Sequence, residues 1–159
     1  MNEEAKKKLL RMIPHALYVL TSQANGKTTA STVSWVTQAS FQPPLVAVGI
    51  KKDSHTFEVV RQAQGFVLNF LGAGQKDIAQ KFFKHVEPES GRVAGEEFVE
   101  SPLLRFPVFP KMAGFVECRV KGMVEQGDHA VVVAEVIEAE SGTLEGPLLL
   151  STTGWNYGG

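Results

Sequence analysis

The chain has little cysteine and no excess of charge of either sign. Its 159 residues include one cysteine, which excludes an internal disulfide, and 16 Lys and Arg stand against 17 Asp and Glu. A protein that binds nucleic acid through its phosphates usually carries a basic excess, so this balance argues against nucleic acid as a partner. The scarcity of cysteine fits a reducing compartment, where disulfides are rare.

Long apolar runs are also missing. The longest, Leu45–Ile50 and Ala130–Ala134, are far shorter than the roughly 20 residues that a membrane-spanning helix needs. Met1–Lys8 is not followed by the apolar segment that a secretory signal peptide contains. We therefore expect no membrane association and a cytoplasmic location. The length and the 43% of hydrophobic residues predict a single globular domain, residues 1–159.

Familiar catalytic and metal-binding motifs are absent as well. The sequence has no Gly-x-Ser-x-Gly elbow and no Walker A loop. Its four histidines lack the spacing of a zinc site, so we expect no metal. Cys118 alternates with Val116 and Val120 along a strand, which favours a core thiol over a nucleophile. Gly72-Ala73-Gly74 resembles part of a dinucleotide loop, but Asp77 occupies the third glycine position, so an ordinary turn explains it better.

The pattern of apolar and turn residues predicts a mostly β protein. Asn25-Gly26 and Gly127-Asp128 are typical of hairpin turns, and β-α-β alternation is lacking. This combination predicts an antiparallel barrel with peripheral helices. Strands are expected at 16–21, 28–41, 45–50, 65–71, 113–126, 129–140 and 148–152, helices at 3–13, 55–63 and 75–84, and a surface loop at 85–100.

Three polar segments have the composition to hold a phosphorylated aromatic cofactor. The strand at 28–37 carries hydroxyls where a buried strand would be aliphatic, next to the indole of Trp35. At 51–56, lysines and hydroxyls stand where a strand enters a helix, and a helix N-terminus binds anions. The segment 81–84 adds two cations and two aromatic rings. Each feature also has a structural explanation, because threonine favours strands, Ser54 caps a helix and phenylalanine packs in cores.

Longer motifs narrow these alternatives. They are Tyr18-Val19-Leu20-Thr21-Ser22, Thr32-x-Ser34-Trp35-Val36-Thr37-Gln38-x-Ser40-Phe41-x-Pro43-Pro44-Leu45-Val46-Ala47-Val48-Gly49-Ile50 and Asp53-Ser54-His55-Thr56, and further matches lie at 65–69, 80–83, 127–129 and 157–159. Together they cover nearly the whole chain and resemble the flavin reductase-like family, whose fold is the FMN-binding split barrel. Within that family, the chain resembles flavoredoxin-type members.

The resemblance implies an NAD(P)H-dependent flavoprotein oxidoreductase that transfers hydride from a reduced nicotinamide to flavin N5. The implied cofactor is FMN, with FAD as the alternative, and the reductant is NADH or NADPH. The resemblance also implies a homodimer with flavin near the interface, and a monooxygenase or another electron acceptor as partner. Many members carry Asn where this chain has Thr29, so the choice of flavin stays open.

The matching positions imply a role for each predicted site residue. Segment 32–37 would lie against the isoalloxazine and ribityl chain, segment 54–56 on the phosphate side, and residues 81–82 in a helix that closes over the site. His129 matches a histidine near the nicotinamide in some members. The predicted cofactor-binding residues are thus Thr32, Ser34, Trp35, Val36, Thr37, Ser54, His55, Thr56, Lys81 and Phe82, and the predicted catalytic residue is His129, which would position the reductant.

The missing catalytic triad is consistent with flavin chemistry. A flavin carries its own electron sink, so the protein has only to bind it, orient it and exclude water. Two other functions stay open from the residues alone. One is a non-catalytic flavin-binding electron carrier that takes electrons from a protein, and the other is a small barrel that binds nucleic acid or oligosaccharide. The near-zero net charge argues against the last of these.

Overall fold

The computed structural model describes residues 1–143 and 146–159. A seven-stranded antiparallel sheet forms its body, in the order β2-β1-β5-β10-β11-β4-β3. The strands of this sheet are β1 (Tyr18–Ala24), β2 (Lys27–Val33), β3 (Val36–Ser40), β4 (Leu45–Lys51), β5 (Gly65–Phe70), β10 (Gly114–Val124) and β11 (His129–Ser141). Two small sheets pair β6 (Arg92–Val93) with β7 (Glu96–Glu97) and β8 (Val99–Glu100) with β9 (Pro107–Val108). The helices are α1 (Glu3–Leu10), α2 (His55–Ala63), α3 (Lys76–Lys81) and the 3-10 turn η1 (Leu150–Thr152).

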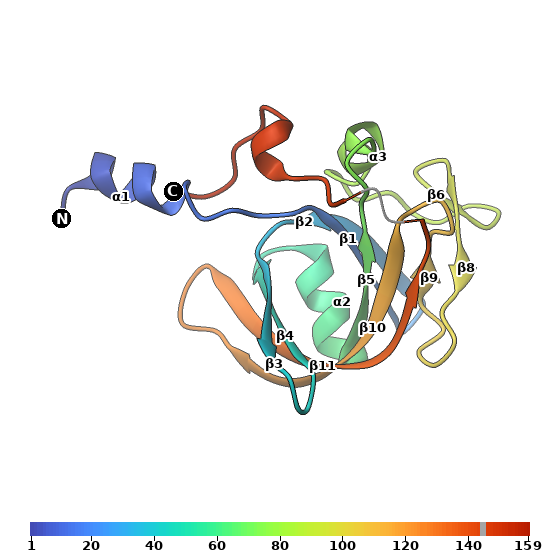
Figure 1. Cartoon of the computed structure of the whole chain (residues 1–159). Helices are drawn as coiled ribbons and strands as arrows, with labels where there is room; N and C mark the ends of the chain where they lie inside the picture. Colours follow the sequence, from blue (N-terminus) through green and yellow to red (C-terminus); the bar gives the residue numbers. More distant parts are fainter. Residues whose placement is uncertain (144–145) are drawn as a thin grey trace.

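The large sheet curls around α2 without closing into a barrel (Figure 1). Its two edges are β2 and β3, which follow each other in the sequence and are separated by Ser34 and Trp35 alone. The chain therefore crosses directly from one edge of the sheet to the other. The predicted mostly β fold, an antiparallel split barrel with peripheral helices, is confirmed, and the split lies between β2 and β3.

The predicted hairpins form for the expected reason. Asn25 and Gly26 connect β1 to β2 with φ angles of 51° and 76°. Positive φ at both central residues is required in a type I′ turn, and Asn-Gly adopts it at low cost. The second hairpin pairs β10 with β11 across the predicted turn at 127–128. The first turn joins two antiparallel strands at one edge of the sheet, and the second joins two near its centre.

Two predicted strands are wrong. Segment 28–41 is not one strand, because it pairs with β1 up to Val33 and with β4 from Val36 onward, at opposite edges of the sheet. Its uninterrupted run of β-branched residues gave no sign of this break. Segment 148–152 forms a single bridge between Ala16 and Leu149 and then the turn η1. The predicted loop at 85–100 contains β6, β7 and β8, and the first and third helices are shorter than expected.

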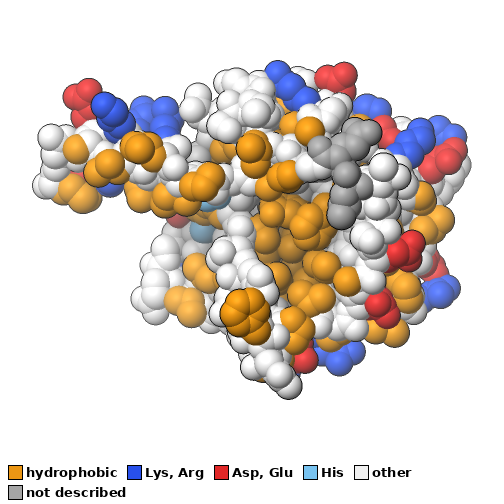
Figure 2. All heavy atoms as spheres, in the orientation of Figure 1, with side chains coloured by type: hydrophobic (Ala, Val, Ile, Leu, Met, Phe, Trp, Pro, Cys, Tyr) orange, Lys and Arg blue, Asp and Glu red, His pale blue; other side chains and the backbone are white. Residues whose placement is uncertain are grey.

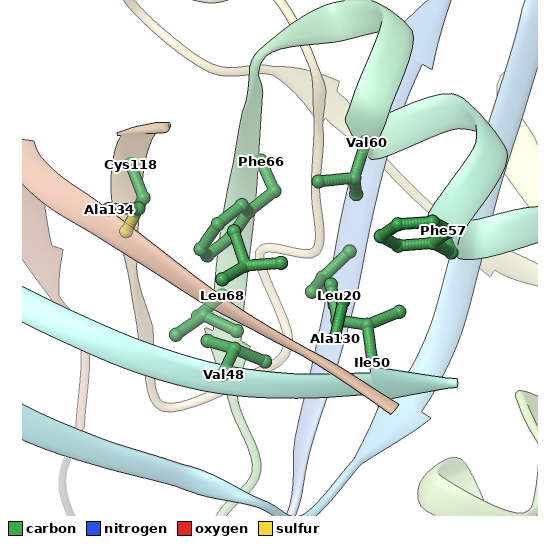
Figure 3. Packing of buried hydrophobic residues seen from close by; sticks show 11 residues of the cluster. Leu20, Val48, Ile50, Phe57, Val60, Phe66, Leu68, Cys118, Ala130 and Ala134 are labelled. Carbon is green, nitrogen blue, oxygen red and sulfur yellow. The ribbon is translucent and has the colours of Figure 1, made fainter. Parts of the chain in front are cut away.

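Helix α2 has the predicted bounds and fills the interior of the curled sheet. Ser54 caps it, since its Oγ accepts a hydrogen bond of 3.0 Å from the backbone N–H of Phe57. The helix ends at Gln64, which has a left-handed conformation with φ of 53°. Its buried face carries Val60 and Phe57 into the core (Figure 3). The cap fixes where the helix starts and therefore where its N-terminus meets the sheet.

The main core lies between α2 and the inner face of the sheet. Phe66 and Leu68 of β5 meet Leu20 of β1 and Val60 of α2, and all four side chains are fully buried (Figure 3). Cys118 belongs to the same cluster, and burial together with the neighbouring carboxylate raises the pKa of its thiol to about 12. The prediction of a core thiol is thus confirmed. No helix in the described residues has the length and apolar composition to cross a membrane.

A buried carboxylate anchors the loop between β8 and β9. Glu117 of β10 is fully buried and accepts hydrogen bonds from the backbone N–H groups of Leu103 (3.1 Å) and Leu104 (2.9 Å). A buried carboxylate is tolerated when hydrogen bonds replace its hydration, and here backbone donors supply them. The loop is consequently tied to the centre of the sheet by one side chain.

Replacing this carboxylate should destabilise the fold. Glu117→Ala removes the acceptor for two amides, and a hydrogen bond to a charged group contributes about 1.5–3 kcal/mol, so we expect a loss of about 3 kcal/mol in the free energy of unfolding. Glu117→Gln keeps one acceptor oxygen and should lose about half as much. Urea unfolding measures both, with the exposed neighbour Arg119→Ala as a control expected within about 0.5 kcal/mol of wild type. Equal midpoints for Glu117→Ala and the control would contradict the anchor.

Candidate functional site

A cavity of about 480 Å³ lies between β2 and β4, next to the N-terminus of α2. Its volume is in the range of small-molecule and cofactor sites. Residues from both sides of the split and from the C-terminal segment form its wall. They are Leu17, Ser31, Thr32, Val33, Ser34, Gly49, Ile50, Lys51, Ser54, Thr56, Phe83, Leu150, Trp155, Asn156 and Tyr157. The break between β2 and β3 therefore creates the place where the cavity lies.

Three hydroxyls form a chain that ends at the cavity. Thr56 Oγ1 donates to Ser31 Oγ at 2.8 Å and lies 2.7 Å from Thr29 Oγ1. Because the Thr56 proton goes to Ser31, Thr29 is the donor to Thr56. No acceptor in the described part of the chain takes the proton of Ser31, which lines the cavity. Of these three hydroxyls, that of Ser31 is therefore the one able to donate to a ligand.

The N-terminus of α2 forms a positive end of the cavity. Ser54 Oγ donates to the carbonyl oxygen of Lys51 at 2.6 Å and accepts from the backbone N–H of Phe57, so its one hydroxyl proton is already used within the chain. The first amides of a helix have no intrahelical acceptor and carry the positive end of the helix dipole. The Lys51 side chain lines the cavity beside them. An anionic group in the cavity would be attracted to this end.

Aromatic side chains from the C-terminus form the opposite wall. We call residues 153–159 the C-terminal strap. Trp155 of the strap packs against Phe83 with ring centroids 4.7 Å apart, and Lys76 Nζ lies 5.1 Å from the Trp155 ring. The strap ends beside α1, where Arg11 Nε donates to the carbonyl oxygen of Gly158 at 3.1 Å (Figure 1). The strap thus spans the cavity from α3 to the start of the chain.

Tyr157 of the strap belongs to a hydrogen-bonded cluster at the edge of the cavity. Its hydroxyl lies 2.7 Å from Nε2 of His129, and Nδ1 of His129 lies 2.9 Å from Oδ1 of Asp128. The Trp35 ring packs against both His129, in a tilted arrangement, and Tyr157, edge to face, with centroid distances of 4.6 and 5.1 Å. Hydrogen bonding to the imidazole lowers the pKa of Asp128, and burial raises the pKa of Tyr157.

Four of the predicted cofactor-binding residues line the cavity: Thr32, Ser34, Ser54 and Thr56. The Thr32 hydroxyl donates to the carbonyl oxygen of Ala79 at 2.6 Å, which ties β2 to α3. Trp35 and His129 lie behind Tyr157 and do not line the cavity in this structure. The structure therefore brings residues of the predicted segment 32–37 and of the predicted segment 54–56 to one cavity.

The remaining predicted residues point elsewhere. Val36 and Thr37 lie on β3 outside the cavity wall, and Lys81 pairs with Glu96. The His55 ring stacks on His85 with centroids 4.1 Å apart, while Phe82 is buried in the core against Phe109 at 5.1 Å. Among the described residues, no group of three or more His, Cys, Asp and Glu side chains could hold a metal ion.

The sequence reasoning missed several residues of the wall. Ser31 stands in the hydroxyl-rich segment, yet only the Thr56 contact distinguishes it from its neighbours. Phe83 adjoins the predicted Phe82, and the end of α3 decides which of the two rings faces the cavity. Trp155 and Tyr157 lie more than a hundred residues beyond β2, so only the fold could place them there.

Comparison with curated proteins gives relatives at about 30% identity. The reductase subunit of stachydrine N-demethylase from Rhizobium meliloti is 31% identical over 134 residues, which are 84% of this chain and 56% of that subunit. The reductase component of 4-nitrophenol 4-monooxygenase from Rhodococcus opacus is 30% identical, covering 79% of this chain and 65% of that protein. Diflavin flavoprotein A 1 from Synechocystis is 31% identical over 87% of this chain and 24% of its own length. The chain thus spans between a quarter and two thirds of these relatives.

Solved structures share the fold. The NADH:FAD oxidoreductase of Streptomyces globisporus, in a complex with NAD and FAD fragments, superimposes with a TM-score of 0.80 at 24% identity, covering 92% of this chain and 88% of that one. A flavin reductase domain protein from Arthrobacter gives a TM-score of 0.80 at 22% identity, covering 92% and 89%. The model of the flavin reductase like domain matches residues 10–158 of this chain. The chain belongs to the flavin reductase like domain family.

Proposed function

We propose that this protein is a flavin reductase that binds FMN in the cavity and transfers hydride to it from NADH or NADPH. The observation that carries the proposal is a single cavity with a positive end at α2, a hydroxyl donor at Ser31 and aromatic walls. The positive end and the Ser31 hydroxyl suit a phosphate, and the aromatic walls suit a planar ring system. The family, and relatives whose names describe reductase components, support the same function.

The residues present fit a flavin. A bound flavin would supply the hydride acceptor and electron sink that the side chains lack. The amides of α2, with Lys51 and Ser31, would hold the phosphate, because charge-assisted hydrogen bonds are stronger than neutral ones. Thr32 and Ser34 line the route between the two ends. Phe83 and Trp155 exclude water from the ring end, and orientation by fixed groups lowers the barrier to transfer.

The proposed activity predicts a reducible flavin complex. The purified protein, mixed with FMN, should give a bound-flavin absorption spectrum that bleaches on anaerobic titration with NADH or NADPH. Parallel titrations with FAD and with each nucleotide would establish the preferred flavin and reductant. A flavin that binds but is reduced by neither nucleotide would instead favour the electron-carrier function. A protein that gains no flavin at all would contradict both.

The anion end predicts a selective loss of FMN. Ser31→Ala removes one donor to the phosphate, a charge-assisted bond of roughly 1.5–3 kcal/mol, so FMN should bind at least about tenfold more weakly while riboflavin binds as before. Flavin fluorescence quenching measures both affinities. Ser40→Ala on β3, outside the cavity wall, is the matched control.

The same titration separates binding from helix capping. Ser54→Ala should lower stability by about 1 kcal/mol through loss of the cap. Because its hydroxyl is already used within the chain, any weakening should be similar for FMN and riboflavin. If Ser31→Ala also weakened the two flavins in parallel, the Ser31 hydroxyl would not contact a phosphate.

We also propose a homodimer, because the apolar side chains of α1 are largely uncovered by its own chain. Its residues are all at least partly exposed, and apolar Leu9, Met12 and Ile13 on and after it are 63%, 70% and 52% exposed. Figure 2 shows hydrophobic side chains along the arm that projects from the body. A helix of this length is unstable in water without tertiary packing. A second copy would supply that packing, with flavin near the interface.

Analytical ultracentrifugation of the flavin-loaded protein should therefore show a dimer at micromolar concentration. Leu9→Asp with Ile13→Asp should shift the protein toward monomer, because burying two charges at an apolar interface is unfavourable. Lys7→Asp with Lys8→Asp, which changes polar positions of the same segment, is the control. A wild-type monomer with flavin fully bound would contradict the dimer and the interfacial site.

The electron acceptor is proposed from the relatives. Two of them are named as reductase parts of a demethylase and of a nitrophenol monooxygenase. By analogy, this protein would deliver reduced flavin to a partner monooxygenase.

A further inference from the structure

Tyr157 separates His129 from the cavity. The Tyr157 ring lines the cavity wall, whereas His129 does not, although the two side chains are joined by a 2.7 Å hydrogen bond. The His129 side chain is only 13% exposed and packs against both Trp35 and Tyr157, whose rings also contact each other. A ligand in the cavity therefore meets the tyrosine and not the imidazole.

The orientation of this hydrogen bond follows from the third member of the cluster. Asp128 is an acceptor, and its contact with Nδ1 of His129 at 2.9 Å places the imidazole proton on Nδ1. In the neutral imidazole Nε2 is then an acceptor, and the Tyr157 hydroxyl donates to it at 2.7 Å. The hydrogen bond from the single hydroxyl proton of Tyr157 to the imidazole thus fixes the orientation of the Tyr157 side chain.

The backbone next to Tyr157 packs closely on Trp35. Gly158 has a φ of 85°, and a Cβ at this position would lie 2.7 Å from Cζ2 of Trp35. Only glycine allows the strap to pass this close to the indole. The Trp35 ring in turn packs on Tyr157 at 5.1 Å. Two contacts, the hydrogen bond to His129 and the Trp35 ring, therefore fix the Tyr157 side chain at the edge of the cavity, and the Gly158 backbone packs on Trp35 beside it.

We propose that Tyr157 is the residue that contacts the reductant at this end of the cavity, and that His129 is a positioning residue that acts through the Tyr157 hydroxyl. The inference rests on the proposed function, because it needs a nicotinamide ring to enter the cavity. Tyr157 offers that ring a planar apolar face, and the Asp128–His129 pair keeps the face in place. His129 then has no direct contact with the reductant.

The test compares wild type, Tyr157→Phe, His129→Ala and the double variant, each loaded with FMN. Two quantities are measured: the rate of flavin reduction by NADH in stopped flow, and the affinity of the oxidised protein for NAD⁺ by calorimetry. Each single variant should slow reduction and weaken NAD⁺ by about tenfold, with FMN affinity within about twofold of wild type. The double variant should be no worse than either single variant, because both remove the same hydrogen bond.

Rescue and control variants make the test specific. His129→Gln keeps an acceptor for the Tyr157 hydroxyl, so it should lose less than His129→Ala. When Tyr157 is already Phe, His129→Gln and His129→Ala should give the same rates and affinities. Tyr18→Phe, at the other tyrosine of the chain, packs on Phe70 outside the cavity wall and should match wild type. Tyr157→Ala should reduce NAD⁺ affinity further, because the ring itself is lost.

Three outcomes would overturn the inference. If the two single losses multiplied to about a hundredfold in the double variant, His129 would act on the reductant directly. If Tyr157→Ala accelerated reduction, the tyrosine would obstruct the reductant instead of contacting it. If FMN-loaded wild type neither bound NAD⁺ nor was reduced by NADH or NADPH, the proposed function would fail as well, which the first two outcomes leave intact.

Discussion

The two residues that link β2 to β3 decide the shape of this molecule. Strands on either side of Ser34 and Trp35 pair with β1 and β4, at opposite edges of one sheet. So short a link brings those edges close together, yet each edge keeps its own backbone partner and the sheet stays open. The interior is filled by α2, whose N-terminus then faces the split. The cavity, its positive end and the strap that covers it all depend on this arrangement.

Hydrogen bonds divide the polar residues near the cavity into two groups. Ser54 and Thr56 have their hydroxyls engaged within the chain, where they fix the start of α2 and its contact with β2. That use leaves the Ser31 hydroxyl and the first backbone amides of α2 available to a ligand, while Lys51, which also lines the cavity, pairs with Asp53 at 3.2 Å. The residue type alone therefore does not assign a role in anion binding. A hydroxyl whose proton is already donated within the chain does not donate it to a ligand as well.

Local signals in the sequence predicted most of the fold, and long-range contacts account for what they missed. Asn25-Gly26 and the Ser54 cap have short-range mechanisms, so the hairpin and the bounds of α2 followed from the residues. The break at Ser34 and Trp35 is set by which strands lie beside each half, and no residue in it disfavours a strand. For the site, the hydroxyl-rich strand and the helix N-terminus were found, whereas the Tyr157 wall was not. Its position depends on Trp35 and Gly158 meeting across the fold.

The strap also explains why the cavity is built from both ends of the chain. Its residues are held by Phe83, Trp35, His129 and Arg11. These partners come from elements distant in the sequence, so the wall forms only when the sheet, α3 and the start of the chain are in place. Because a flavin brings its own redox chemistry, the protein's contribution is geometry. Because this wall forms only in the complete fold, the geometry of the cavity depends on folding. At this end of the cavity, Tyr157 contributes the side chain that lines the wall.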